Sequence, residues 1–165
     1  MSADADAWVR RLALAPHPEG GCYRETWRSA ETLAAGTLPP RFEGARPLGT
    51  TIYYLLRAGE RSRLHRLRAD ELWALHAGGP LSLHLLADGG HREVVLGGDA
   101  PHHVAPHGAW IAAEPAPGAP FALVTCATWP GFAFADFEPG ARAALLADFP
   151  GHGDVVRRFT DPGGA

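Results

Sequence analysis

The chain has 165 residues, of which 46% are hydrophobic and 20% charged, and its formal net charge is −3 at pH 7. This length fits one domain with a substantial core, so we expect a single domain over residues 1–165. The small negative charge provides no basic face, and we expect no nucleic-acid partner. No apolar run reaches the ~18 residues that cross a bilayer, and the acidic start of the chain differs from a signal peptide. We predict a cytoplasmic protein that does not bind membranes.

The first predicted element is a short helix near the N-terminus. Asp4 or Asp6 can cap it, and Trp8 and Leu12 fall at helical spacing. The segment PHPEGG, residues 16–21, then ends the helix, because its prolines lack N–H donors and its glycines favour a turn.

Most of the remaining chain is predicted to form strands. Residues 22–29 alternate with a period of two, whereas residues 30–49 have no sustained period and predict a long loop. Four strands follow in residues 50–88 and three or four more in residues 91–132, each bounded by Gly or Pro. Only residues 138–151 predict a second helix. Seven or eight strands between two short helices predict an all-β fold, either a closed barrel or a jelly roll.

A histidine and a glutamate lie on either side of a bend between two of these strands. Period two places His65 and Leu67 on one face, and after the bend it places Glu71 and Trp73 on one face. If this face is the barrel interior, His65 and Glu71 are costly to bury unless they are paired or used. We interpret His65 as a catalytic base or hydrogen-bond partner, and Glu71 as its orienter or a second polar contact. The alternative is a hydrogen bond between the two that only fixes the bend.

Aromatic side chains on neighbouring strands add the character of a small-molecule pocket. Such pockets are mostly apolar, with a few convergent polar groups. Each aromatic residue has the alternative role of simple core packing, and Tyr54 is an alternative to Tyr53. The candidate ligand-binding residues are Tyr23, Glu25, Tyr53, Trp73, His84 and Trp110.

The same stretch has the spacing of a known metal-binding motif. The order Gly59, His65, Glu71 and Gly78 resembles the first motif of the cupin superfamily, which has a second histidine where Leu67 stands. The match covers four positions of that motif and lacks one metal ligand.

The second cupin motif is also incomplete. Pro106 and Gly108 resemble its start, but Ile111 stands in place of its histidine. A catalytic zinc site usually has three protein ligands, and a non-haem iron site has two histidines and a carboxylate. His84 or His107 could supply a third ligand, although each has a simpler interpretation as a polar residue near the surface. We expect no metal and no other cofactor.

The resemblance is closer at the level of one family. The chain resembles the cupin-5 family, a domain of unknown function numbered 985, in five blocks: HPEGGCYRETWRS, TTIYYLL, SRLHRLRADELWALHAGGPLSLHLL, APHGAWIAAE and TWPGFAFADFE. This resemblance implies a double-stranded β-helix whose barrel core covers about residues 17–138, with short N- and C-terminal helices. It also implies a homodimer, and it carries no established reaction.

The N-terminal block supports a further alternative. HPEGGCYRETW resembles a motif of the dTDP-sugar 3,5-epimerases, which are also cupins: Gly21, Tyr23 and Glu25 match, and Gly20 replaces a nucleotide-binding arginine. Those enzymes use a barrel histidine as a general base, which the resemblance assigns to His65. Three hypotheses result. The first is a small polar, sugar-like or carbonyl-bearing ligand bound without a full metal site. The others are a sugar-nucleotide isomerase or epimerase, and a metal-dependent cupin enzyme with an atypical ligand set.

Overall fold

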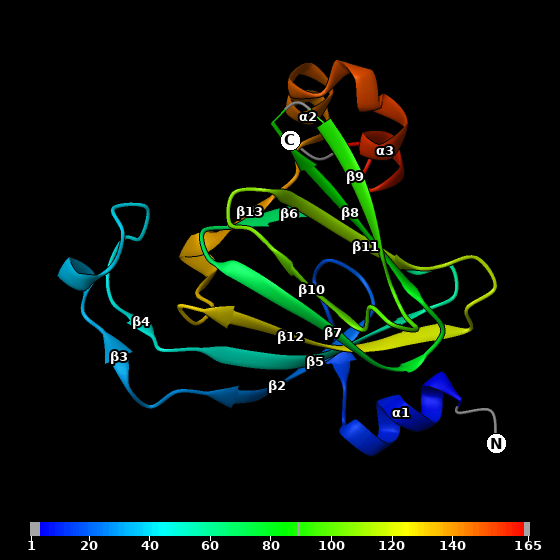
Figure 1. Cartoon of the computed structure of the whole chain (residues 1–165), viewed down its shortest axis with the longest axis horizontal. Helices are drawn as coiled ribbons and strands as arrows, with labels where there is room; N and C mark the ends of the chain where they lie inside the picture. The colour runs from blue at the N-terminus through cyan, green and yellow to red at the C-terminus, as the bar shows by residue number, and fades with distance from the viewer. Residues whose placement is uncertain (1–3, 89, 164–165) are drawn as a thin grey trace.

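The computed structural model describes residues 4–88 and 90–163, and two antiparallel sheets form most of it (Figure 1). The six-stranded sheet has the order β1(Ala15–Pro16), β2(Cys22–Arg28), β5(Thr50–Arg57), β12(Phe121–Trp129), β7(Asp70–Gly78) and β10(His102–Ala105). The five-stranded sheet has the order β13(Phe137–Pro139), β6(Ser62–Leu67), β11(Trp110–Pro115), β8(Leu81–Ala87) and β9(Gly90–Leu96). From β5 onwards the chain passes repeatedly from one sheet to the other, which is the topology of a jelly roll. The predicted all-β, double-stranded β-helix is confirmed.

Short helices cover the outer faces of both sheets (Figure 1). The first helix, α1(Ala5–Leu12), begins as predicted at Asp4, whose carboxylate accepts the Asp6 N–H at 3.0 Å. It packs with Leu55, Phe121 and Leu123 on the outside of the six-stranded sheet. No helix within residues 4–88 and 90–163 is long and apolar enough to cross a membrane.

The C-terminal region differs from the single helix predicted for residues 138–151. Its first residues belong to β13, and the helix is shorter, α2(Arg142–Asp148). A 3₁₀ turn, η3(Pro150–His152), follows because Pro150 interrupts the helix, and a further helix, α3(Gly153–Arg158), then packs beside α2. These helices bury Leu145, Val156 and Phe159 over the five-stranded sheet.

The predicted loop of residues 30–49 contains some regular structure. It forms an arm that extends away from the barrel, with the strand pair β3(Thr32–Leu33) and β4(Arg46–Pro47) and the 3₁₀ turn η1(Ala35–Thr37) (Figure 1). At its base, Arg46 donates from Nε and Nη2 to both carboxylate oxygens of Asp136 at 2.6 and 2.7 Å, and both side chains are buried. Asp136 ends the 3₁₀ turn η2(Phe134–Asp136), so this ion pair fixes the segment that follows β12.

The space between the sheets is filled at one end only. A core cluster that includes Tyr54, Trp73, Leu83 and Ile111 packs there, and Tyr54 meets Trp73 edge to face at 5.9 Å. Cys126 belongs to this cluster and also lines the cavity beyond it. The cavity is therefore continuous with the core.

Candidate ligand-binding cavity

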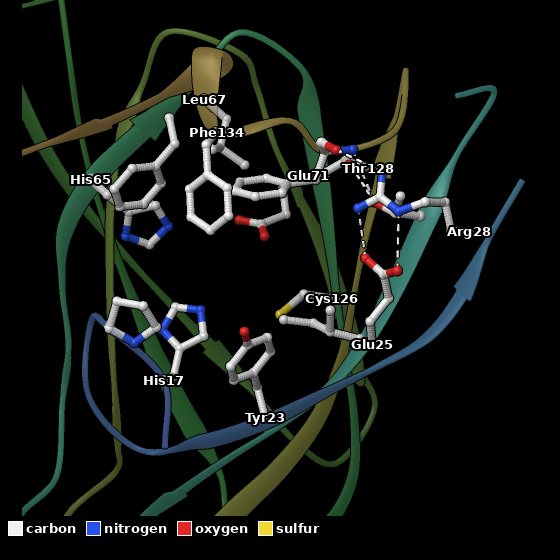
Figure 2. A pocket seen from close by; sticks show the side chains of 15 residues that line it. His17, Tyr23, Glu25, Arg28, His65, Leu67, Glu71, Cys126, Thr128 and Phe134 are labelled. Carbon is white, nitrogen blue, oxygen red and sulfur yellow. Dashed lines mark hydrogen bonds and ion pairs between the residues drawn. The ribbon is translucent and has the colours of Figure 1, made fainter. Parts of the chain in front are cut away.

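A cavity of about 190 Å³ lies between the two sheets. This volume corresponds to the liquid volume of roughly six water molecules, so a ligand that fits inside it is small. Figure 2 shows side chains from both sheets and from the segment after β12 pointing into the same space. The walls combine aromatic and aliphatic groups with a few polar ones: Pro18, Ile52, Leu67, Phe132, Phe134 and Phe137, with His17, Tyr23, Glu25, Arg28, Thr50, His65, Glu71, Cys126 and Thr128.

Four of the predicted site residues are brought together here. His65, Glu71, Tyr23 and Glu25 all line the cavity, although they come from three strands in two sheets. In Figure 2, His65 and Glu71 reach into the cavity opposite Tyr23. The expectation that the imidazole and the carboxyl group face one interior space is therefore met.

The other four candidates do not line the cavity. Tyr53 lies on the outer face of β5 beside α1, where it meets His76 edge to face at 6.1 Å, and Tyr54 is the tyrosine that faces inward. Trp73 shares the face of Glu71, as predicted, but it is packed into the core at 1% exposure. Trp110 and His84 lie on the outer face of the five-stranded sheet, under the C-terminal helices.

His65 presents one defined nitrogen to the cavity. Its Nδ1 lies 2.8 Å from the carbonyl oxygen of Arg63, and a carbonyl can only accept, so Nδ1 carries the proton. In the neutral ring, Nε2 then has a free lone pair. Phe137 stacks on the imidazole at 5.5 Å and holds its plane. The carbonyl of Arg63, rather than Glu71, is therefore the group that orients this histidine.

Glu71 has a different partner from the one expected. Trp73 donates its Nε1–H to Oε2 at 2.8 Å, and no hydrogen bond between Glu71 and His65 occurs in the described part of the chain. The hypothesis that these two residues bond each other to fix the bend is wrong. Burial raises the pKa of Glu71, and a positive charge on His65 and the Trp73 hydrogen bond act in the opposite direction. Glu71 therefore keeps its proton to a higher pH than a surface glutamate.

His17 is a cavity residue that the sequence reasoning missed. It lies in the turn between β1 and β2, where Gly20 has a φ of +106° and a Cβ would come within 2.2 Å of the Arg61 carbonyl oxygen. The backbone N–H of Glu19 donates to His17 Nδ1 at 3.0 Å, so the ring proton of the neutral form lies on Nε2. Burial lowers the pKa of His17 to about 4, and positive charge on His65 and Arg63 acts in the same direction. The only signal in the sequence was the position of His17 at the start of the HPEGGCYRETW block.

The charged groups at the edge of the cavity neutralise each other. A bulge between Glu25 and Trp27 shifts the register of β2, which brings Arg28 opposite Thr50 on the cavity face. Arg28 then donates to both carboxylate oxygens of Glu25, at 3.0 and 2.7 Å, and to the carbonyl of Phe132 at 3.0 Å (Figure 2). The described lining therefore contains no arginine or lysine that is free of a carboxylate.

The residues in the barrel do not fit the four-ligand metal site of the cupin motifs. Ile111 is the direct partner of His65 across β11 and β6, and Leu67 is two residues from His65 on the same strand. Both positions face the interior, and neither side chain can coordinate a metal. His84 is on the outer face, and His107 is bonded to Asp70 at the surface, so neither supplies the third ligand. Across residues 4–88 and 90–163, no three His, Cys, Asp or Glu side chains are grouped to hold a metal ion.

Comparisons with known proteins agree with this architecture. The family model described as "Cupin superfamily (DUF985)" matches residues 6–139. Two solved structures are similar over nearly their whole length. A hypothetical protein from Leishmania major is 34% identical, with a TM-score of 0.84 over 97% of this chain and 99% of that one. A protein from Shewanella oneidensis is 36% identical, with a TM-score of 0.83 over 98% and 99%.

A more distant similarity concerns the fold alone. The oxalate decarboxylase from Bacillus subtilis is 14% identical, with a TM-score of 0.54 over 88% of this chain and 36% of the enzyme. The search of curated proteins gave no match.

Proposed function

The chain belongs to the cupin superfamily, in the DUF985 family, and we propose that it binds a small, polar, sugar-like or carbonyl-bearing molecule with a hydroxyl group in its barrel cavity. The observation that carries this proposal is the free Nε2 of His65, which faces a partly open, mainly apolar cavity. His65 is only 6% exposed, and no described protein group bonds its Nε2, which opens on the cavity. Polar groups inside native proteins usually meet a protein partner, a ligand or an ordered water, so this nitrogen is a place where a ligand can bond.

The surrounding groups support a polar ligand of low molecular weight. Tyr23 directs its hydroxyl group into the cavity in Figure 2, and no protein hydrogen bond of that hydroxyl occurs among the described residues. Glu71 adds a carboxyl group whose pKa is raised by burial. Apolar walls with a few convergent polar groups are typical of small-molecule sites. We assign His65 Nε2 as the acceptor for a hydroxyl group of the ligand, because it cannot bond a carbonyl oxygen, and Tyr23 and Glu71 as further polar contacts.

A panel of small aldehydes, ketones and sugars tests this proposal by thermal unfolding. A ligand at 100 times its Kd adds about 2.7 kcal/mol to the free energy of unfolding. For a domain of this size we expect a rise in Tm of about 5–10 °C. The variant His65→Leu should lose this rise. The matched control is His84→Leu, since His84 is equally buried, at 7% exposure, but lies outside the cavity. The proposal fails if no compound raises Tm, or if His65→Leu responds like the wild type.

A second candidate function is proton transfer at a carbon beside a carbonyl group, as in an isomerase or epimerase. The observation that favours it is the tautomer of His65, whose Nε2 is available as a general base while Nδ1 is held by Arg63. For a sugar-nucleotide substrate, the phosphates would have to remain outside the cavity, because Arg28 is already engaged by Glu25.

Deuterium exchange separates this candidate from binding alone. The sugar nucleotide is incubated with the protein in heavy water, and mass spectrometry follows deuterium at the carbon next to the carbonyl. We expect exchange in the wild type and in His84→Leu, and at least a hundredfold slower exchange in His65→Gln, because general base catalysis contributes about 10²–10⁴ in rate. Equal exchange rates with and without protein would remove the candidate. A homodimer and a cytoplasmic location stay predictions.

A further inference from the structure

The two cavity histidines carry opposite tautomers. Nδ1 of His17 accepts an N–H from the backbone, whereas Nδ1 of His65 donates to a backbone carbonyl. In their neutral forms, Nε2 of His17 is therefore a donor and Nε2 of His65 is an acceptor. In Figure 2 the two rings lie one above the other on the same side of the cavity, and both point into it.

We propose that His17 is a second ligand-binding residue, and that His17 and His65 together select an uncharged α-hydroxycarbonyl compound of about six non-hydrogen atoms. The carbonyl oxygen of the ligand accepts from His17 Nε2–H, and the neighbouring hydroxyl donates to His65 Nε2. This inference rests on the proposed function and adds the class of ligand.

The His17 donor is held in place by its surroundings. Tyr23 meets the ring edge to face at 4.7 Å, and Tyr54 lies against it at 4.9 Å. The Tyr54 hydroxyl donates to the carbonyl oxygen of Gly20 at 2.7 Å, which fixes the turn that carries His17. A positioned donor loses little conformational entropy when a ligand binds. Because the pKa of His17 is about 4, the ring is neutral at pH 7 and keeps this donor pattern.

The preference for an uncharged ligand follows from the charges around the cavity. A carboxylate or phosphate would find no free arginine or lysine in the described lining, because Arg28 is already engaged by Glu25 through two hydrogen bonds. A buried charge without a partner is strongly unfavourable. The volume limits the part of a ligand that fits inside the cavity, since a carbon or oxygen atom with its hydrogens needs about the room of one water molecule. Ketones and aldehydes of triose size satisfy both conditions.

NMR of the full-length protein tests the tautomers directly. Long-range ¹H–¹⁵N correlations of the imidazole rings at pH 7 should show His17 protonated at Nε2 and His65 protonated at Nδ1. This measurement needs no variant, so it does not depend on whether a substitution folds. A His17 ring protonated at Nδ1 would overturn the inference.

Titration with three matched probes tests the ligand class. Hydroxyacetone offers a carbonyl and an adjacent hydroxyl, acetone lacks the hydroxyl, and lactate replaces the ketone with a carboxylate. We expect hydroxyacetone to bind about tenfold more tightly than acetone, since one hydrogen bond to a buried group contributes about that factor. Lactate should cause no shifts at the cavity residues. Equal affinities for hydroxyacetone and acetone, or tight binding of lactate, would contradict the inference.

Variants of the two histidines test whether each of them binds hydroxyacetone. His17→Phe keeps an aromatic ring without the donor and should weaken hydroxyacetone about tenfold, whereas His17→Gln, which retains an amide donor, should recover part of this loss. His84→Leu is the control and should bind like the wild type. If His65→Leu abolishes binding while His17→Phe does not change it, this inference fails and the proposed function stands. If neither these probes nor the wider panel of carbonyl compounds bind the wild type, both fail.

Discussion

Buried or half-buried histidines occur in two regions of this molecule, and they have different surroundings. In the cavity, His17 and His65 each bond the backbone through Nδ1 and leave Nε2 facing open space. On the outer face of the five-stranded sheet, His84 Nδ1 bonds His91 Nε2 at 3.1 Å and the ring packs on Phe159 at 4.6 Å. The outer histidines therefore bond each other and are covered by α3, whereas the cavity histidines are oriented by the backbone. His65 and His84 are almost equally buried, so exposure does not distinguish the cavity histidines from the outer ones. They differ in where Nε2 points, which is into the cavity for His65 and toward Glu114 for His84.

Substituting a tryptophan in each region should give the largest difference in the free energy of unfolding. Trp73 donates to the buried Glu71, whereas Trp110 packs under α2 and α3 with Arg66 over its ring at 4.6 Å. Trp73→Phe leaves Glu71 without its donor and reduces core packing, so we expect a loss of about 3 kcal/mol in the free energy of unfolding. For Trp110→Phe we expect about 1–2 kcal/mol, because no buried polar group loses its partner.

Urea unfolding at pH 7 measures both tryptophan variants. Hydroxyacetone binding is measured for the same two variants. Only Trp73→Phe should change it, because only this variant removes the hydrogen bond to Glu71. Equal losses of stability, with unchanged binding in both variants, would show that the Trp73–Glu71 hydrogen bond has no special role.

The strands could be predicted from the sequence, but the inner face of several of them could not. In β6, SRLHRL does not alternate between apolar and polar residues, and His65 was placed on the inner face through its position in the cupin-like motif. In β5 and β11, helices cover the outer side as well, and both faces are mainly apolar. Period two then identifies a strand without showing which side is inside. Tyr53 and Trp110 were assigned to the wrong face for this reason. His84 was also assigned to the cavity, although Leu81, Leu83 and Leu85 alternate with Ser82 and His84 and occupy the inner face.

The missed cavity residues depend on features without a periodic signal. His17 reaches the cavity through a turn whose shape requires glycine at positive φ, and Arg28 reaches it through a one-residue bulge in β2. A bulge moves every later side chain of the strand to the opposite face. Phe134 comes from a 3₁₀ turn fixed by the buried Arg46–Asp136 pair, which joins residues 90 positions apart. The sequence could therefore place the motif residues, but not the walls around them.

His17 should also produce a pH dependence of stability. In the unfolded chain its pKa is that of an ordinary histidine, 6.5, and in the folded protein burial lowers it to about 4. Between these values the unfolded state binds a proton that the folded state does not, so stability falls as pH decreases from 6.5 to 4. His17→Gln has no imidazole to titrate at this position. Between pH 6.5 and pH 4 we therefore expect the unfolding free energy of the wild type to decrease by roughly 2 kcal/mol more than that of His17→Gln.

Urea midpoints at several pH values between 4 and 7 measure this difference. The raised pKa of Glu71 acts in the opposite direction, since the folded state then binds the extra proton, but this contribution is common to both proteins. Parallel curves for wild type and His17→Gln would mean that the buried imidazole titrates normally. They would also remove the argument that His17 remains a neutral donor at mildly acidic pH.

The smallest effect is expected at the outer histidines. Nε2 of His84 is buried without a hydrogen bond, and it lies 3.7 Å from Glu114 Oε1. His84→Leu removes this unsatisfied atom together with the hydrogen bond to His91, which is less buried and can bond water instead. These two changes offset each other, so we expect the unfolding free energy to change by less than about 1 kcal/mol. A loss above about 2 kcal/mol in urea unfolding would mean that the outer histidines hold α3 on the sheet. His84→Leu would then be unsuitable as the control for His65→Leu, and the two regions would differ less than their geometry indicates.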